Sequence, residues 1–358
     1  MRWLRVGAAI AAAALASVIG LAVIPPAQAC ACGGVVAPDG VEVDITGENA
    51  VLSWDGTTER MLLSMNTLTE AADAGLLIPT PAPAEVALAE TTVFSELETL
   101  TAPEVEIEYR WWPDLILEAP EQEGPTHQSA VSVLDTRQLG DLAVTTLAAS
   151  DADALTAWLA ANGYVMRDGL ADSLVPYVSE GWYYVAVRLT TEAENLSGAL
   201  QPLDLRFESE RLIYPMRLSA AATSDQAVRT YVFADYRVQR IDESAANGVS
   251  SVYFAGEVAS TALTSTSLVE IVGQHRYLTV IDQSFDDPSE QIISDFQFGQ
   301  APSDTAVRQV QTTVRMRQIM DLPAGPVLTI SAMVVVLIGT LTVSGVRRHR
   351  RRNRPADW

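Results

Sequence analysis

The chain has 358 residues, of which 48% are hydrophobic and 19% are charged, a composition typical of a folded protein and not of a disordered one. Its net charge is −22, and the range from Cys30 to Gly325 holds 15 Arg against 44 Asp and Glu, which gives −29. Such a charge repels nucleic acid and anionic lipid headgroups and attracts cations. We therefore expect no nucleic-acid partner, and a cation or a basic protein is the kind of partner that the charge favours.

The first 29 residues have the pattern of a secretory signal peptide. Arg2 and Arg5 precede an apolar run over residues 6–24, and the small-x-small sequence just before Cys30 is typical of signal peptidase cleavage. We therefore predict that residues 1–29 are a signal peptide and that the mature chain begins at Cys30.

The end of the chain has the pattern of a membrane anchor. Residues 326–346 are 21 residues without a charge, and as a helix with a rise of ~1.5 Å per residue they reach about 31 Å, the thickness of a bilayer core. Arginines follow directly, and arginines beside a span stay on the cytoplasmic side. This predicts a single-pass protein of the cell membrane, with residues 30–322 as an extracytoplasmic domain and residues 347–358 as a basic cytoplasmic tail.

The pattern of apolar residues predicts more strands than helices. Alternation from Val41 to Leu63 around Asp55-Gly56 indicates a β-hairpin, and Leu76-Leu77-Ile78 indicates a short strand that ends at Pro79. Helices are predicted at residues 91–100, 150–162 and 172–178. Further strands are predicted at residues 105–112, 130–134, 142–147, 182–189, 203–207, 212–214, 230–238, 252–254, 268–272 and 277–281. Without regular alternation of strands and helices, this predicts an α+β fold with mainly antiparallel sheet.

Two stretches read as connections. Glu118 to Gln128 contains two prolines, a glycine and three glutamates, which favours a loop and a subdivision of the extracytoplasmic domain near residues 118–128. Phe285 to Asp304 is acidic and rich in turn residues, and we expect it to lead to a juxtamembrane stalk that ends at Asp321-Leu322-Pro323.

Several stretches of the chain, in order and spacing, resemble a known family. They are Cys32-Gly33-Gly34-Val35-Val36-Ala37, Asp55-Gly56-Thr57-Thr58-Glu59-Arg60-Met61-Leu62-Leu63-Ser64-Met65, Leu77-Ile78-Pro79-Thr80-Pro81-Ala82, Gly181-Trp182-Tyr183-Tyr184-Val185-Ala186 and Tyr214-Pro215-Met216-Arg217-Leu218-Ser219. The chain is similar there to the bacterial domain of unknown function 2330, as an exported, membrane-anchored, actinobacterial-type member. The resemblance implies an exported bacterial domain without an established activity, so it assigns no functional residue.

Cys30 and Cys32 are the candidate metal-binding residues. They are the only cysteines in the chain, and cleavage before Cys30 would place two thiolates and a free α-amine within three residues. Such a group suits Cu(I), or zinc with ligands from elsewhere. The sequence leaves open whether the two cysteines are oxidised, lipidated or metal-bound, and it indicates no cofactor.

The sequence lacks the motifs of the common hydrolases. It contains no Gly-x-Ser-x-Gly and no His-Glu-x-x-His, and since it has no Lys it holds neither a phosphate-binding loop nor a Ser-x-x-Lys nucleophile. A Ser-His-Asp triad through His127 or His275 stays open, as does a glycosidase with two carboxylates on facing strands.

Two further clusters have both a functional and a structural interpretation. Asp282, Asp286, Asp287 and Glu290 would suit a calcium loop, but they lack its spacing and central glycine, which favours a solvated acidic turn. The aromatic runs Trp111-Trp112 and Trp182-Tyr183-Tyr184 would suit a carbohydrate or peptide platform, although alternation along a strand places about half of such rings in the core.

Together these observations favour a surface binding or scaffold module without a catalytic residue. The two alternatives are an extracytoplasmic hydrolase with paired carboxylates and a metal-binding or redox protein centred on Cys30 and Cys32. The sequence does not decide whether the protein is an enzyme, and it does not predict the oligomeric state.

Overall fold

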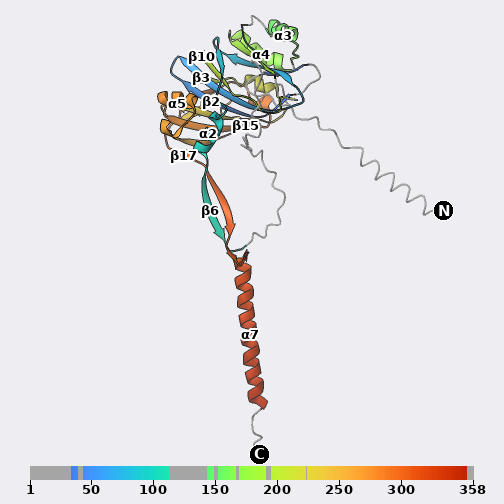
Figure 1. The fold of residues 1–358 in the computed structure, drawn as a ribbon, viewed down its shortest axis with the longest axis vertical. Helices are drawn as coiled ribbons and strands as arrows, with labels where there is room; N and C mark the ends of the chain where they lie inside the picture. Colours follow the sequence, from blue (N-terminus) through green and yellow to red (C-terminus); the bar gives the residue numbers. More distant parts are fainter. Residues whose placement is uncertain are drawn as a thin grey trace, which may run out of the picture. The chain divides into compact units, whose positions relative to one another are not determined.

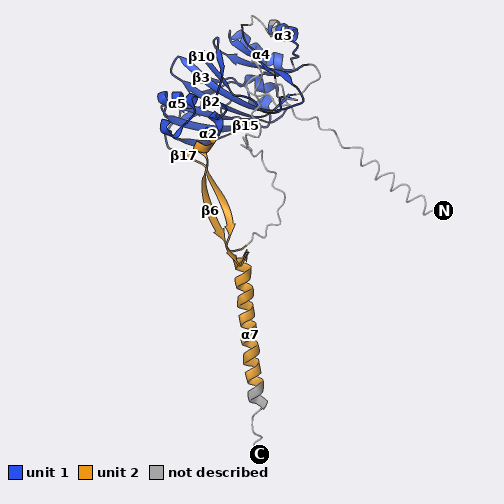
Figure 2. Ribbon diagram, in the orientation of Figure 1, with its two compact units in different colours: residues 1–96, 131–305 blue, residues 97–130, 306–358 orange. Residues whose placement is uncertain are grey.

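The computed structural model describes most of the chain, and within it two compact units. Unit 1 comprises residues 1–96 and 131–305, and unit 2 comprises residues 97–130 and 306–358 (Figure 2). The described residues are 34–38, 43–112, 143–148, 152–166, 169–190, 195–222 and 224–352. The predicted signal peptide, the predicted linker at residues 118–128 and the predicted strand at residues 130–134 lie outside them, so these three stay predictions.

The largest sheet of unit 1 is built around the predicted hairpin. Its strands, in spatial order, are β14 (Val249–Glu257), β15 (Tyr277–Phe285), β12 (Gln226–Ala234), β2 (Val43–Trp54), β3 (Thr58–Thr69), β10 (Leu203–Glu208) and β5 (Glu85–Leu88), and β9 (Gly198–Ala199) also pairs with β3. Among these pairs only β12 and β2 run parallel. The turn between β2 and β3 forms because Oδ1 of Asp55 accepts from the N–H groups of Thr57 and Thr58, and because Gly56 has φ +101°.

A second, smaller sheet lies against the first. It consists of β1 (Gly34–Val36), β4 (Asp73–Thr80), β8 (Tyr183–Thr190) and β7 (Ala143–Ala148) in that order, with every pair antiparallel. The prediction that Pro79 ends its strand was wrong. Pro79 pairs with Tyr184 within β4, and the strand continues to Thr80, because pairing with β8 holds the chain extended through the proline.

The buried residues arrange these sheets as two inner layers. One core cluster joins them, with residues such as Leu52 and Val232 from the large sheet and Leu76 and Val187 from the small one. Alternate residues of the large sheet, among them Tyr231, are buried on its other face. The outer face of the small sheet packs against α3 (Ala152–Ala161) and α4 (Leu170–Ser179), which lie side by side in Figure 1.

Two helices cover the other side of the large sheet. The first, α2 (Val93–Thr101), begins in unit 1, where the ring of Phe94 meets the ring of Tyr231 edge-on with centroids 6.2 Å apart. The second is α5 (Thr266–Gln274), which replaces the strand predicted at residues 268–272. That prediction was wrong because the apolar residues Leu268, Ile271 and Val272 follow the helical spacing of three and four, and Ser265 caps the helix. Unit 1 is therefore layered as helices, sheet, sheet, helices.

A three-stranded sheet at the rim of unit 1 consists of β11 (Ile213–Tyr214), β16 (Phe296–Gln300) and β13 (Val238–Arg240). The short helices η1 (Arg217–Ala221) and α6 (Pro288–Gln291) contact each other, and a third short helix, η2 (Ser260–Ala262), contacts α5. The acidic, turn-rich residues 285–304 belong to unit 1, and whether the residues after them form a juxtamembrane stalk stays a prediction. Phe296 is fully buried beside Phe285 and Tyr214, and this burial holds the stretch inside unit 1.

Unit 2 contains a two-stranded ribbon and a long helix. Strand β6 (Glu104–Arg110) pairs in parallel with β18 (Val310–Met316), and β17 (Val307–Arg308) precedes β18. A short hairpin of β19 (Gln318–Ile319) and β20 (Leu322–Pro323) leads into α7 (Ala324–Arg352). The part of α7 from Ala324 to Arg348 is long and apolar enough to cross a membrane, and it is the one such helix among the described residues. The structure as a whole confirms the predicted α+β class.

Candidate functional site

An open groove of about 1240 Å³ lies at the rim of unit 1. Its walls come from the turn between β2 and β3, the end of α4, the segment that joins β10 to β11, and the segments that follow β13 and α6. Six acidic residues line it, against two arginines, Arg211 and Arg217. The acidic residues are Glu180, Glu208, Glu210, Asp242, Glu243 and Asp295.

Arg217 joins two of the acidic walls. Its Nε donates to Oδ2 of Asp295 at 2.8 Å, and its Nη1 and Nη2 donate to the two carboxylate oxygens of Glu180 at 2.5 and 2.8 Å. The guanidinium carbon lies 4.0 Å from the ring centroid of Tyr177 and 5.6 Å from that of Trp182. Stacking and bidentate pairing together fix this guanidinium in one orientation.

Asp295 is 4% exposed and forms the floor of this arrangement. Its Oδ1 accepts from the backbone N–H groups of Met216 at 2.7 Å and Arg217 at 3.0 Å, and from the hydroxyl of Tyr177. Burial raises the pKa of Asp295, and the charge of Arg217 acts against that rise. Burial also raises the pKa of the Tyr177 hydroxyl, which therefore stays protonated and donates.

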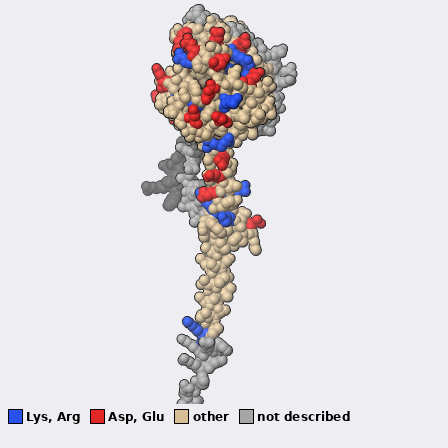
Figure 3. Space-filling view, turned by 90° about the vertical axis from the view of Figure 1, so that its left-hand side faces the viewer, with Lys and Arg blue, Asp and Glu red and all other residues tan. Residues whose placement is uncertain are grey.

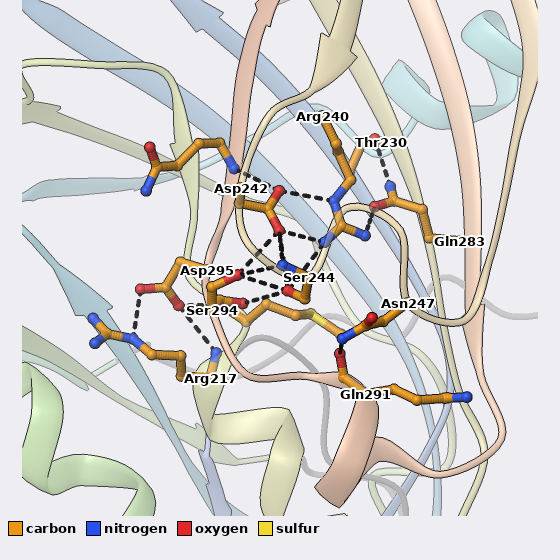
Figure 4. A network of polar contacts seen from close by, with 12 residues as sticks. Arg217, Thr230, Arg240, Asp242, Ser244, Asn247, Gln283, Gln291, Ser294 and Asp295 are labelled. Carbon is orange, nitrogen blue, oxygen red and sulfur yellow. Dashed lines mark hydrogen bonds and ion pairs between the residues drawn. The ribbon is translucent and has the colours of Figure 1, made fainter.

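A second acidic residue of the groove, Asp242, has its own arginine. Nη2 and Nε of Arg240 donate to its two oxygens at 2.6 and 3.0 Å, and Ser244 and Ser294 donate to Oδ1 (Figure 4). Burial acts to raise the pKa of Asp242, but the hydrogen bonds and charge of Arg240 outweigh burial and lower it. In Figure 4 Asp242 and Asp295 each have a separate guanidinium partner.

The remaining acidic side chains are unpaired. Glu208, Glu210 and Glu243 are exposed, and among the described residues none of them has an ion-pair partner. Nη1 of Arg211 donates to Oε1 of Gln297 at 3.2 Å. The groove therefore combines a rigid, neutralised floor with three free carboxylates on its walls.

Three of the six acidic residues of the groove are held by arginines. A general acid and a general base must each be free to exchange a proton with the substrate. Glu180 and Asp295 are instead held together by Arg217, and Asp242 is held by Arg240.

The predicted metal-binding residues Cys30 and Cys32 lie outside the described residues, so the metal or redox role stays a prediction. Among the residues that are described, no group of three or more His, Cys, Asp or Glu is placed to hold a metal ion. In the predicted acidic turn, Asp282 pairs with Arg229, and Asp287 caps α6 by accepting from the N–H of Glu290.

His275 forms only part of a triad. Its Nδ1 lies 3.0 Å from Oδ1 of Asp235, whereas its buried Nε2 has no hydrogen-bond partner in the described parts of the chain. No serine there completes a triad with this histidine. His127 lies outside the described residues.

The aromatic runs are separated by the fold. Trp182 lines the groove, Tyr184 is fully buried in the core, and burial raises the pKa of the Tyr184 hydroxyl to about 12. Trp111 and Trp112 belong to unit 2 and are both exposed. The sequence reasoning did not single out Arg217 or Asp295 as site residues, although Arg217 stood within one of the stretches that carried the family resemblance.

The fold and the last helix define the class of protein: a mainly antiparallel α+β protein with one candidate membrane-spanning helix at its C-terminal end. The chain belongs to DUF2330, a family of uncharacterised proteins conserved in bacteria, which it matches over residues 26–299. The resemblance noted in the sequence is thereby confirmed.

No curated protein matches the chain. Among solved structures, baculovirus P35 is similar with a TM-score of 0.37 and 12% identity, over 70% of this chain and 98% of P35. A mutated baculovirus P35 after caspase cleavage gives 0.32 and 13%, over 70% of this chain and 96% of the other. The caspase-8/P35 complex gives 0.29 and 10%, over 70% and 92%. Similarity at this level carries no inference about fold or function.

Proposed function

We propose that the protein is a membrane-anchored, extracytoplasmic binding module whose groove receives a positively charged segment of a partner protein. The observation that carries this proposal is the groove with three unpaired glutamates, Glu208, Glu210 and Glu243, above a fixed floor. A guanidinium or ammonium group entering it would meet carboxylates that have no internal cation to displace.

The surroundings of the groove support the same ligand chemistry. Trp182 offers an aromatic surface beside the acidic walls, and aromatic rings attract cations through their π-electrons. The net charge of the chain, −22, adds a long-range attraction for a basic partner, which speeds association at low ionic strength. In Figure 3 acidic and arginine side chains are interspersed over the visible face of unit 1, so the groove acts locally and not as one uniformly acidic surface.

The orientation in the membrane follows from the two ends of the chain. The signal-peptide pattern of residues 1–29 supports export, and the arginines at the C-terminal end of α7 support retention of the tail on the cytoplasmic side. Protease added to intact cells is expected to degrade residues 30–322 and to leave a membrane-protected fragment that contains α7. Degradation only after lysis would contradict this orientation.

Peptide binding tests the groove. The full chain in lipid nanodiscs is titrated with a ten-residue arginine-rich peptide and with its neutral and acidic counterparts, at two salt concentrations. Only the basic peptide is expected to bind, and its affinity is expected to fall as salt rises. Replacing Glu208, Glu210 and Glu243 together with Gln is expected to weaken binding by about tenfold, since each exposed pair contributes roughly 0.5 kcal/mol.

A matched variant makes this test specific. Glu70, Glu85 and Glu257 are exposed glutamates of unit 1 that do not line the groove. Replacing these three with Gln changes the net charge equally, so their variant is expected to bind the basic peptide with nearly the original affinity. Equal weakening in both variants would show that the peptide senses only the overall charge, and the groove proposal would then be wrong.

A further inference from the structure

The segment that joins the ribbon of unit 2 to α7 carries a group of exposed apolar side chains. Tyr109 lies in the last part of β6, Trp111 and Trp112 follow that strand, and Met320 and Leu322 lie in the hairpin of β19 and β20. These five residues, here called the collar, are 47% to 92% exposed. A group of exposed aromatic and aliphatic side chains that lie near one another marks an interaction surface.

Backbone hydrogen bonds tie the collar to the first turn of α7. The N–H of Gly325 donates to the carbonyl of Trp111 at 2.8 Å, and the N–H of Ala324 donates to the carbonyl of Arg317 at 2.7 Å. A Cβ at Gly325 would lie 2.5 Å from that carbonyl oxygen and 2.8 Å from the Trp112 ring, so only glycine allows this approach. The collar therefore continues directly from the apolar helix.

At the tip of the hairpin, the exposed side chain of Met320 is apolar and its backbone has an unfavourable positive φ. Met320 and Asp321 have φ +53° and +63°, as in a type I′ turn, where Asn and Gly are the favoured residues. A methionine in this conformation is unusual, and Met320 is the most exposed collar residue at 92%. Contact of this tip with an apolar environment, and not with water, would explain why a methionine stands there.

Charge changes sign along the ribbon toward the collar. The far part of β6 carries Glu104 and Glu106, whereas Arg315 and Arg317 lie next to the collar. The carboxylates nearer to it are Glu108, which pairs with Arg110, and Asp321 at the hairpin tip. The guanidinium carbon of Arg317 is 4.9 Å from the ring centroid of Trp111 and 5.6 Å from that of Tyr109. Both rings and Arg317 line a cavity of about 660 Å³ that Leu328 of α7 also borders.

We propose that the collar lies in the outer headgroup layer of the membrane that α7 spans, with Arg317 paired to a phospholipid phosphate. Tyr and Trp are enriched at this depth because their rings are apolar and their N–H or O–H groups are polar. Arginine matches phosphate geometrically, and the glutamates farther along β6 are repelled from the same layer. This inference depends on the membrane-spanning role of α7 in the proposed function and is independent of the groove.

Fluorescence quenching tests the depth of the collar. The full chain is reconstituted in phosphatidylcholine vesicles whose acyl chains are brominated near the carbonyl end, and tryptophan emission is compared with that in unbrominated vesicles. Lipid quenching is expected, and it is expected to be largely lost in the Trp111→Phe/Trp112→Phe variant. The control is Trp54→Phe, which removes a tryptophan of unit 1 and is expected to leave the lipid-quenched fraction unchanged.

The outcomes separate this inference from the anchoring of the protein. If alkaline carbonate extracts the chain from the vesicles, α7 does not span them, and the anchoring and the collar proposal both fail. If the chain stays inserted but aqueous iodide quenches Trp111 and Trp112 and brominated lipid does not, only the collar proposal is overturned. Protection from both quenchers, with a dimer trapped by cross-linking, would also overturn it, because a second copy would then cover the collar.

A second variant tests the tip without unfolding the hairpin. Asn is favoured at positive φ, so Met320→Asn is expected to keep the turn while it removes the apolar side chain. We expect weaker quenching of Trp111 and Trp112 by brominated lipid and greater access of iodide to them. Quenching identical to that of the original chain would contradict the insertion of the tip.

Discussion

Nε of Arg217 donates to Oδ2 of Asp295 at 2.8 Å across 78 residues of sequence, and this pair forms the floor of the acidic groove. The side chain of Asp295 is 4% exposed and that of Arg217 is 16% exposed, so the pair is nearly shielded from water. Glu180, the other partner of Arg217, is 45% exposed. The same guanidinium thus holds one buried and one solvated carboxylate, and the two contacts differ in their energetic consequences.

Removal of Arg217 is expected to destabilise unit 1 strongly. Arg217→Met leaves the charge of Asp295 buried without its cation, which costs about 3 kcal/mol or more. Arg211→Met, an exposed arginine of the same groove, is expected to change the free energy of unfolding by no more than about 0.5 kcal/mol. Urea unfolding of both variants measures the difference. A double-mutant cycle is expected to give a larger coupling of Arg217 to Asp295 than to Glu180, and the reverse order would contradict the role of burial.

Glu59 is expected to make stability depend on pH. Its side chain is fully buried, Oε2 accepts from the N–H of Ile213 at 3.1 Å, and Oε1 has no partner among the described residues. Burial raises the pKa of Glu59 well above the ordinary value of 4.5, against the hydrogen bond from Ile213.

The sign of the effect follows from the protons bound by each state. Below pH 4.5 the carboxyl is protonated in the folded and unfolded states alike. As pH rises from 4.5 toward the raised pKa of the folded state, only the unfolded state releases its proton, so stability falls by up to about 1.4 kcal/mol per pH unit. Glu59→Gln lacks this slope. Unfolding measured from pH 4 to 8 should give a smaller decline for the variant, and parallel curves would show that Glu59 is ionised when folded.

Gly248 and Gly56 are expected to respond differently to alanine. Both have positive φ, +66° and +101° respectively, but a Cβ at Gly248 would lie 2.4 Å from the carbonyl oxygen of Ser284, whereas a Cβ at Gly56 would meet nothing within 4 Å. Gly56→Ala is expected to cost about 1 kcal/mol from backbone strain alone. Gly248→Ala adds a steric clash and is expected to cost about 2–4 kcal/mol. Thermal unfolding compares the two, and equal losses would contradict the packing at Gly248.

The N-terminus of α5 is expected to depend on Ser265. Its hydroxyl accepts from the N–H of Leu268, and its own N–H donates to Oε2 of Glu96 at 2.9 Å. Ser265→Ala removes the side-chain acceptor of the Leu268 N–H, while Glu90 still accepts from the N–H of Thr266, and the substitution is expected to cost about 1 kcal/mol. Ser267→Ala, two residues further inside the helix, serves as the control and is expected to have little effect. Chemical denaturation of the two variants provides the comparison.

Local sequence signals were sufficient where neighbouring residues decide the structure. The hairpin around Asp55-Gly56 was predicted because the Asp side chain and the glycine make the turn within four residues. The helix at 91–100 corresponds to α2 for the same reason, since apolar residues at helical spacing already define its buried face.

The sequence did not predict the strand pairing of the ribbon or the groove, because residues distant in sequence form both. The strand predicted at residues 268–272 is a different kind of error, because the spacing of Leu268, Ile271 and Val272 and the cap by Ser265 are local signals of the helix α5. The strand predicted at Val105 to Trp112 is confirmed as β6, but no strand was predicted for its parallel partner, β18, which lies about 200 residues later. The groove had no motif, because its walls come from turns and strand ends spread from Gly56 to Gln297.

The amino-acid sequence by itself determined the α+β class, the family and a C-terminal stretch long and apolar enough to cross a membrane, because composition, alternation and apolar length are properties of contiguous residues. Only the tertiary structure decided which carboxylates are paired and which are free. Asp295 and Asp242 are identical to Glu208 and Glu243 in charge, and they differ only in the guanidinium groups that folding brings against them and in the water that folding removes.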